Sequence, residues 1–322
     1  MAAGSCGRRS GPGRRRPAGT GGEAAMDVDV LCVGHACYDL ALSVPRHPGP
    51  DEKLFAERLA LGGGGPAANA AVAVRRLGGS ASFLGYLGND DWGERHAREL
   101  AAEGVDTSLL VRGDAPTPLA VSLVKPDGAR SVVNHSAATP KLEAEPAGRL
   151  RPAARAVLFD GHEPKVSPPI AAEARRRGIP TVLDAGSCHE GTRTLAGMVD
   201  YLVASERFAA QAAGASDPEE ALRRLGASHP CVVVTLGERG LLWSFRGERG
   251  RLPAYRVRCL DSTGAGDAFH GAFALGVARR MDWESLLRFA SAAGALACTR
   301  FGARQGLPSA EEVAGLLGRA GR

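Results

Sequence analysis

The 322-residue sequence has few lysines, few aromatic residues and no long apolar run. Because no stretch of about 18 apolar residues occurs, we expect no transmembrane helix and no membrane partner. None of the four lysines follows a glycine, which excludes the GxxxxGK[ST] loop of Walker-type nucleotidases. The first predicted strand is not followed by GxGxxG, and neither GxSxG nor HExxH occurs. These absences exclude several common enzyme classes.

Cysteine usage indicates neither a disulfide framework nor a zinc site. The seven cysteines contain no CxxC pair, and Cys32 and Cys231 lie within apolar runs typical of buried strands. We expect them to be small core residues in a reducing compartment, which favours a cytoplasmic location.

Residues 1–25 differ in composition from the rest of the chain. They are rich in glycine, alanine, proline and arginine and lack apolar periodicity, so we expect a disordered extension. Five arginines against Glu23 give this segment +4 of the formal net charge of +5, which leaves the body near +1 and argues against a nucleic-acid partner. Two origins stay open: translation from Met26, or an arginine-rich targeting segment.

From residue 27 onward, short apolar strands alternate with helical stretches. Residues 28–34, 81–88, 155–161, 179–186, 200–205 and 231–237 are predicted strands. The last is almost continuously apolar, which is typical of a strand buried on both faces of a parallel sheet. Helices are expected at 66–79, at 90–104 and throughout the C-terminal third. The pattern predicts an α/β fold.

Two segments interrupt this alternation. Residues 40–61 contain no good helix, and residues 118–135 are predicted to form a strand, a Pro-Asp-Gly turn and a second strand. We expect the two segments to pair into a small second sheet that forms a lid over the strand ends.

The segment DSTGAGDAFHGAF, residues 261–273, places small residues and a carboxylate where a helix is predicted to begin. The first N–H groups of a helix lack partners and attract an anion, and Gly264 and Gly266 allow a phosphate to approach closely. Asp267 is then placed to accept a proton from a hydroxyl beside that phosphate. The combination favours phosphoryl transfer; the alternative is an aspartate that only stabilises the helix dipole.

This segment and GGGGPAANAAVAVRRLGG, residues 62–79, together resemble the two signatures of the ribokinase family of sugar kinases, also called the PfkB family. The agreement in order and spacing extends from about residue 28 to residue 308. Residues 288–308 and GGGPAA are most similar to the sulfofructose kinase branch, followed by ketohexokinase-like and fructokinase-like branches. The resemblance implies one kinase domain over residues 26–322, with a three-layer α/β sandwich, a mostly parallel sheet and a β-sheet lid.

The resemblance also implies substrates and site residues. ATP would be the phosphoryl donor, with Mg²⁺, possible K⁺ and a homodimeric assembly. Asp267 corresponds to the general base, and the anion hole to the N–H groups of Gly264, Ala265 and Gly266. The residues implied to bind the sugar are Asp39, Gly63, Gly64, Gly65 and Asn69. Those implied to contact the nucleotide are Thr235, Gly237, Gly240, Ser205 and Glu206. Asp261 and Thr263, with the backbone of residues 299–304, match a monovalent-cation loop.

The sequence departs from the family pattern at two places. The Asn-x-x-Glu stretch of many members reads Ser205-Glu206-Arg207-Phe208, so Phe208 replaces the usual acid. We therefore expect Glu206, or water and phosphate oxygens alone, to serve Mg²⁺. Cys37 stands where ribokinase has an asparagine, and a lysine of the first signature is missing, which favours a ketohexose-like acceptor over ribose.

We expect ATP-dependent phosphorylation of a primary hydroxyl of a small sugar or sugar derivative, of fructose or sulfofructose type. Two alternatives stay open: a nucleoside kinase, which the 5% aromatic content disfavours, and a catalytically silent sugar-sensing protein. His35, His135 and His162 are interpreted as dispersed. His270 is expected to serve helix packing rather than nucleotide binding.

Overall fold

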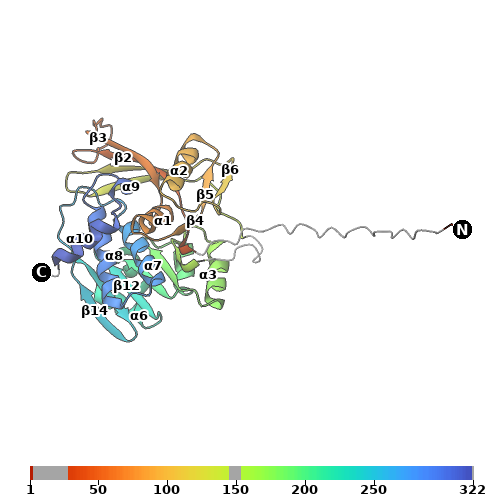
Figure 1. Ribbon diagram of the computed structural model, residues 1–322. Coiled ribbons are helices and arrows are strands. Elements are labelled where there is room, and N and C mark those ends of the chain that lie inside the picture. Colours follow the sequence, from red (N-terminus) through yellow and green to blue (C-terminus); the bar gives the residue numbers. More distant parts are fainter. Residues whose placement is uncertain (3–27, 145–153, 321–322) are drawn as a thin grey trace.

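The apolar segments assemble into a central sheet (Figure 1). In this computed structural model, which describes residues 1–2, 28–144 and 154–320, eight strands pair in the order β14-β13-β12-β11-β10-β9-β1-β4. They are β1 (Val28–Val33), β4 (Ala81–Leu84), β9 (Ala154–Phe159), β10 (Thr181–Ala185), β11 (Tyr201–Ser205), β12 (Cys231–Thr235), β13 (Leu241–Phe245) and β14 (Glu248–Leu252). Strands β12, β11, β10, β9, β1 and β4 run parallel. Strands β13 and β14 form an antiparallel hairpin that the sequence pattern did not predict. The predicted mostly parallel sheet is confirmed.

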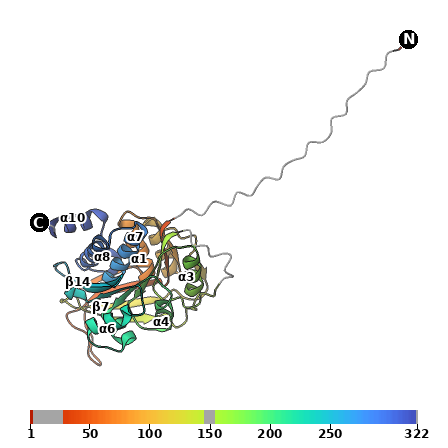
Figure 2. The same ribbon diagram turned by 90° about the horizontal axis from the view of Figure 1, so that it is seen from below.

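Helices cover both faces of this sheet (Figure 2). One layer contains α1 (Pro66–Arg76), α7 (Ala265–Ala278), α8 (Trp283–Ala297) and α10 (Ala310–Ala320). The other contains α3 (Ser167–Arg176), α4 (Glu190–Ala196), α5 (Glu206–Ala213) and α6 (Pro218–Gly226). Alternate strand residues enter the two cores: Val30 and Cys32 face the first layer, Leu31 and Val33 the second. The three-layer α/β sandwich is therefore confirmed.

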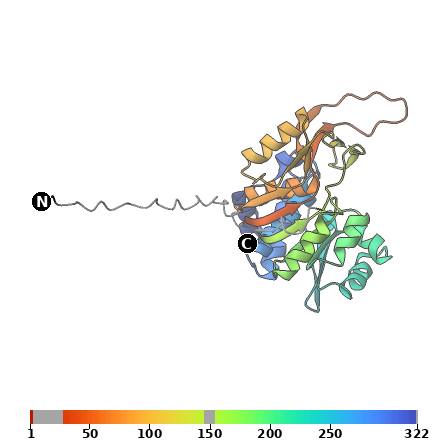
Figure 3. The same ribbon diagram turned by 90° about the vertical axis from the view of Figure 1, so that its right-hand side faces the viewer.

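A separate small sheet has the strand order β3-β2-β7-β8. Its strands are β2 (Cys37–Ser43), β3 (Arg58–Gly64), β7 (Leu119–Val124) and β8 (Arg130–His135). The two segments predicted to form a lid supply these strands, but β2 already begins at Cys37 and β3 extends into the glycine-rich signature at Gly64. The connection between β2 and β3 reaches out from the body of the molecule (Figure 3). That this sheet acts as a lid, and the division of the chain at residue 25, stay predictions.

The shorter elements are β5 (Tyr86–Gly88) and β6 (Val111–Gly113), which form a two-stranded sheet, α2 (Asp91–Ala102), the 3₁₀ turn η1 (Gly237–Arg239) between β12 and β13, and α9 (Ala303–Gly306). The predicted extension lies, except for its first two residues, outside the described part of the chain. In that described part, no helix is both long and apolar enough to cross a membrane.

Small side chains allow α1 and α7 to approach closely. A Cβ added to Gly271 of α7 would lie 2.7 Å from the carbonyl oxygen of Ala70 in α1. One turn earlier in α7, the same approach brings Asp267 to Asn69, the neighbour of Ala70. Close packing of two helices thus joins residues 198 positions apart.

The buried carboxylate of Asp160 fixes the turn that follows β1. Its oxygens accept hydrogen bonds from the backbone N–H groups of His35 at 2.7 Å, Ala67 at 3.2 Å and His162 at 2.9 Å. Gly34 leaves room for this carboxylate, since a Cβ there would overlap it. Asp160 therefore ties the end of β1 and the first turn of α1 to the end of β9.

Replacing Asp160 with alanine should lower the free energy of unfolding by about 2–4 kcal/mol, because it leaves three backbone donors without their charged acceptor. Urea denaturation followed by circular dichroism measures this loss. Asp127→Ala, at an exposed turn, is the control and should unfold at nearly the wild-type urea concentration. Equal midpoints for the two variants would contradict the assigned role of Asp160.

Candidate active site

The first turn of α7 presents free backbone donors. Gly264 adopts a left-handed conformation with φ of 81° and precedes Ala265, the first helical residue. The N–H of Ala265 donates to the carbonyl oxygen of Ser262 at a long 3.4 Å. For the N–H groups of Gly264 and Gly266, no acceptor lies within hydrogen-bonding distance among the described residues. Two of the three amides assigned to the anion hole are thus available to a ligand.

Asp267 is the third residue of α7 and is partly exposed. Its Oδ2 accepts a hydrogen bond of 2.7 Å from Nδ2 of Asn69. Burial, assisted by the negative charge of Asp184, raises the pKa of Asp267 to about 6, while the Asn69 hydrogen bond opposes the rise. A carboxylate with this pKa is ionised at neutral pH yet basic enough to accept a proton.

Asp39 in β2 lies beside Gly64 in β3, where a Cβ would overlap its carboxyl group. The Cys37 thiol donates to Oδ1 of Asp39 at 3.2 Å. Burial, assisted by the charge of Asp267, raises the pKa of Asp39 to about 6, while the hydrogen bond from Cys37 opposes the rise. The two carboxyl groups predicted to serve the sugar are therefore within electrostatic range of each other.

An open cavity lies between the small sheet and the segment that follows α8. It is lined by Asp39, Ala41, Ala60, Leu61, Gly62, Gly63, Ser122, Thr263, Gly302, Ala303, Arg304 and Gln305. Asp39 and Gly63 were predicted to bind the acceptor, and they line it. The lining does not include Gly64, Gly65 or Asn69, which were also predicted to bind the acceptor, and it does not include Asp267. Gly64 instead accommodates Asp39, and Gly65, with φ of 94°, starts α1.

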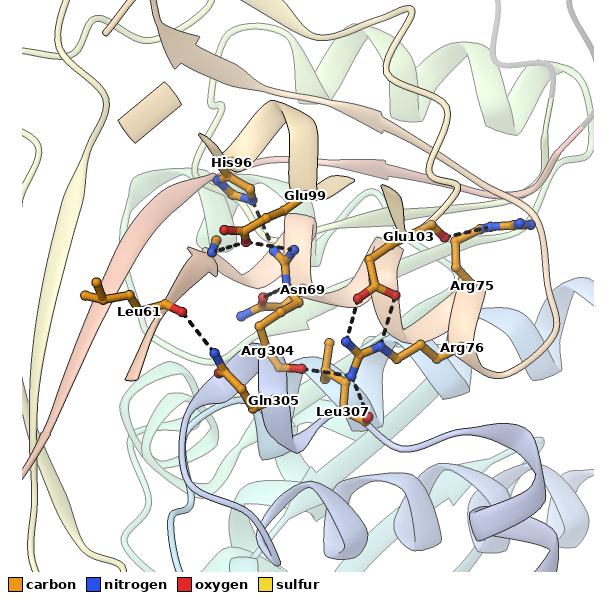
Figure 4. A network of polar contacts seen from close by, with 11 residues as sticks. Leu61, Asn69, Arg75, Arg76, His96, Glu99, Glu103, Arg304, Gln305 and Leu307 are labelled. Carbon is orange, nitrogen blue, oxygen red and sulfur yellow. Dashed lines mark hydrogen bonds and ion pairs between the residues drawn. The ribbon is translucent and has the colours of Figure 1, made fainter. Parts of the chain in front are cut away.

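Arg304, which the sequence analysis did not identify, connects several of these residues (Figure 4). Its side chain is buried, with 6% of its surface exposed. Nε donates to Oδ1 of Asn69 at 3.1 Å, and Nη2 lies 3.0 Å from Nε2 of His96. Oε2 of Glu99 lies 3.9 Å from Nη1, and the same oxygen accepts from the N–H of Gly63 at 2.6 Å. The only signal in the sequence was a charged residue in a stretch of small residues.

The turns after β11 and β12 hold the residues assigned to the nucleotide. Ser205 caps α5: its Oγ accepts from the N–H of Phe208 at 3.0 Å and donates to the carbonyl of Gly186 at 2.9 Å. Glu206 forms an ion pair with Arg239 of η1, which joins the two turns. Phe208 is buried in the core, so the position of the usual family acid has a packing role here.

The other members of this group lie on the same two turns. The hydroxyl of Thr235, the last residue of β12, lies 3.3 Å from the carbonyl oxygen of Ala204. Gly237 and Gly240 flank Arg239 with φ of 60° and 88°.

Asp261 is completely buried and joins two loops. Oδ1 accepts from the N–H and the hydroxyl of Thr263 at 2.9 and 2.6 Å, and Oδ2 accepts from the N–H of Gly302 at 2.9 Å. Among the residues that the structure describes, no cationic side chain pairs with it. A buried carboxylate with only neutral partners fits a monovalent cation. Over the same residues, no cluster of three His, Cys, Asp or Glu side chains could hold a metal ion.

The histidines are arranged differently from the sequence interpretation. His35 and His162 are not dispersed: with His189 they form a series of ring contacts, with centroids 5.1 and 4.8 Å apart, because they follow the adjacent strands β1, β9 and β10. His270 is buried, with Nδ1 2.6 Å from the carbonyl oxygen of Gly266 and 3.2 Å from Oδ2 of Asp184. Both ring nitrogens thus lie beside oxygen atoms inside the protein, Nε2 being 3.3 Å from the carbonyl oxygen of Val203.

Sequence comparison identifies the family. The pattern described as "pfkB family carbohydrate kinase" matches residues 27–310. The chain belongs to this family. It is 28% identical over 300 residues to ribokinase from Haemophilus influenzae, a match that covers 89% of this chain and 98% of the relative. It is 31% identical to fructokinase-1 from Oryza sativa subsp. japonica over 285 residues, covering 79% and 88% of the two chains.

A solved member of this family has the same architecture. The structure of Arabidopsis thaliana ribokinase complexed with ribose and ATP superimposes with a TM-score of 0.80 at 26% identity, covering 91% of this chain and 99% of the other. The ribokinase-like fold is therefore confirmed. As a member of a carbohydrate kinase family with ribokinase and fructokinase relatives, the chain is a phosphotransferase.

The partly buried carboxylate of Asp39 should destabilise the folded protein at neutral pH. Its folded-state pKa of about 6 exceeds the ordinary 3.8, so the folded state binds the proton more tightly and stability falls as pH rises from about 4 to 6. Asp39→Asn should therefore raise the melting temperature at pH 7.5, and the gain should shrink as the pH is lowered toward 4. Differential scanning calorimetry at both pH values measures this. A lower melting temperature at pH 7.5 would contradict it.

Proposed function

We propose that the protein is an ATP-dependent kinase that phosphorylates a primary hydroxyl of a small sugar or sugar derivative. One observation carries the proposal: the carboxylate of Asp267 lies in the first turn of α7, beside the free N–H groups of Gly264 and Gly266. A base and an anion site in one helical turn are what phosphoryl transfer to an alcohol requires.

In the proposed reaction, the acceptor hydroxyl attacks the γ-phosphorus of ATP while Asp267 accepts its proton. The new O–P bond forms in line with the bond that breaks, and ADP leaves. The N–H groups of Gly264 and Gly266, with Ala265 between them, stabilise the charge on the transferred group. Asp39 and the backbone of Gly63 hold the other acceptor hydroxyls, and closure of the small sheet excludes water.

The proposal includes ATP because the Arabidopsis relative was solved with ribose and ATP. The joined turns after β11 and β12 supply its contacts through Ser205, Glu206, Thr235, Gly237 and Gly240. Mg²⁺ would neutralise phosphate charge, held by Glu206 or by phosphate oxygens and water alone. Asp261 and Thr263, with the backbone of the Gly302 loop, would hold K⁺.

We favour a ketohexose-like acceptor. The 31% identity to a fructokinase and the Cys37 thiol on Asp39 support this choice. A nucleoside kinase is the second candidate, but the cavity lining, taken over the described residues, contains no aromatic side chain to stack on a base. A silent sensor is disfavoured by the intact base and anion site.

We also propose a homodimer in the cytoplasm. The small sheet exposes apolar side chains, among them Leu59, Val132 and Val133, the last with 67% of its surface exposed. An apolar face of this kind is typical of a subunit interface. The cysteines in the described ranges are all free thiols, as a reducing compartment requires.

Asp267→Asn should retain ATP binding and lose at least about 10²-fold in kcat, because the amide cannot accept the proton. ADP release with D-fructose, D-ribose and adenosine measures turnover, and isothermal titration calorimetry measures nucleotide binding. Asp127→Asn, on the exposed turn of the β7–β8 hairpin, is the control. Wild-type turnover by Asp267→Asn would contradict the mechanism, and a preference for adenosine would replace the sugar acceptor by a nucleoside.

The rate should depend on pH through the ionisation of Asp267. Because the base acts only when deprotonated and burial raises its pKa to about 6, kcat/KM should fall as the pH drops below about 6 and level off above it. Measurement between pH 5 and 8 tests this. Asp39→Asn removes the second carboxyl group with a pKa of about 6, and the acid limb should persist in this variant because Asp267 is the proposed base. A flat wild-type profile would show that Asp267 is not the titrating base.

A further inference from the structure

A chain of hydrogen bonds connects the candidate base Asp267, through Asn69, to the buried cation of Arg304. Figure 4 shows its link between Asn69 and Arg304. Nδ2 of Asn69 donates to Asp267 at 2.7 Å, and Oδ1 of Asn69 accepts from Nε of Arg304 at 3.1 Å. Asn69 is 1% exposed, so both ends of its amide are engaged inside the protein. The chain links α7, α1 and α9, although Asn69 and Arg304 are 235 positions apart in the sequence.

Arg304 determines which way the Asn69 amide points. A guanidinium group has only donors, so the amide oxygen must face Arg304 and the NH₂ group must face Asp267. If the amide were reversed, its oxygen would lie against the carboxylate of Asp267 and two donors would face each other. Without Arg304, Asp267 would be the one remaining group in this chain of contacts that favours the orientation in which the Asn69 NH₂ group faces the carboxylate.

Arg304 is itself held rigidly. Nη2 lies beside Nε2 of His96. Burial and the charge of Arg304 lower the pKa of His96 well below its usual range, so the ring is neutral and accepts the bond. The backbone carbonyl of Arg304 accepts a hydrogen bond of 2.9 Å from Arg76, and Arg76 forms an ion pair with Glu103 at 2.5 Å. These bonds hold both the guanidinium group and the backbone of Arg304, which lets the side chain orient its neighbour.

The burial of Arg304 has no strong compensating ion pair. Glu99 lies 3.9 Å away, and no hydrogen-bond acceptor for Nη1 is found in the described ranges. A buried charge with incomplete pairing contributes little to stability and is often replaceable by an apolar side chain. The position of Arg304 is therefore better explained by what it does to Asn69 than by the stability of the fold.

The surroundings of Asp267 show why a donor at this point matters. Asp184 of β10 raises the pKa of Asp267, and Asp39 of β2 lies close enough for the charge of Asp267 to raise its own pKa. Opposing them are His270 of α7, Arg130 of β8 and the Asn69 hydrogen bond. Of these, Asn69 is the group that makes a direct hydrogen bond to the Asp267 carboxylate.

We propose that Arg304 is a positioning residue for phosphoryl transfer: it fixes the orientation of the Asn69 amide and thereby keeps a hydrogen-bond donor on the carboxylate of Asp267. The catalytic consequence rests on the proposed function of Asp267 as the base. The structural relay itself does not depend on turnover, so it is tested separately.

The test is a pH titration of the Asp267 carboxyl carbon by NMR in protein labelled with [4-¹³C]aspartate, with the signal assigned by its loss in Asp267→Asn. Two neutral variants form a matched pair. Both Arg304→Met and Arg304→Gln remove the charge, but Nε2 of glutamine occupies the same place along the side chain as Nε of arginine and still donates to Asn69. Arg304→Met should raise the midpoint by about half a unit to one unit above that of Arg304→Gln.

Equal midpoints in Arg304→Met and Arg304→Gln would overturn the proposal, because the effect of Arg304 would then be its charge alone. In an Asn69→Leu background, Arg304→Met should shift the midpoint no further than Arg304→Gln does; a persisting difference would likewise overturn it. Arg288→Met is the control: it removes a guanidinium group from an exposed ion pair with Glu284 of α8 and should leave the titration of Asp267 unchanged.

A measurement on the unaltered protein covers the case in which Arg304→Met does not fold. The side-chain NH₂ resonances of Asn69 should titrate with the same midpoint as Asp267, because one of these protons is bonded to its carboxylate. Resonances that stay constant from pH 5 to 8 would overturn the proposal. Failure of the proposed function would look different: Asp267→Asn would stay active whatever these titrations show.

Discussion

The hydrogen bond between Asn69 and Asp267 is the contact on which the site depends. A carboxylate that must act as a base close to neutral pH has to lose most of its water without losing its charge. Burial and the nearby Asp184 favour the protonated form, whereas the neutral amide donor and the first turn of α7 favour the carboxylate. The result is a group whose pKa of about 6 lies within reach of its proposed task.

The fold produces this contact through close helix packing and through buried carboxylates that join loops. Gly271 lets α7 approach α1, and the two helices then place Asp267 and Asn69 side by side. Asp160 fixes the entry to α1, and Asp261 fixes the entry to α7 against the Gly302 loop. Each of these carboxylates accepts backbone N–H groups from segments far apart in the sequence. These hydrogen bonds tie the loops before α1 and α7 to other parts of the fold.

The sequence indicated those parts of the protein that depend on local pattern. Nearly continuous apolar runs such as residues 231–235 predicted buried parallel strands, and the GAGD segment predicted a helix start with free donors. Both were correct, because periodicity and helix ends are properties of neighbouring residues.

The missed features depend on contacts between distant residues. Arg304 gains its importance only from its contact with Asn69, and the ring contacts of His35, His162 and His189 exist because three adjacent strands end at one edge. The hairpin of β13 and β14 escaped prediction because its polar outer strand has no apolar run. The spacing of residues in the sequence does not reveal contacts between such distant residues. The family resemblance pointed to Asp267, Asp39 and Asn69, but not to Arg304, which donates to the Asn69 amide.

The most direct test of the central claim is a crystal structure of the protein with a non-hydrolysable ATP analogue, Mg²⁺ and D-fructose. The account predicts that a primary hydroxyl lies within about 2.6–3.2 Å of an Asp267 oxygen and that the γ-phosphate is bound by the N–H groups of Gly264 and Gly266. A γ-phosphate bound away from these amides, or an acceptor separated from Asp267 by protein, would contradict it.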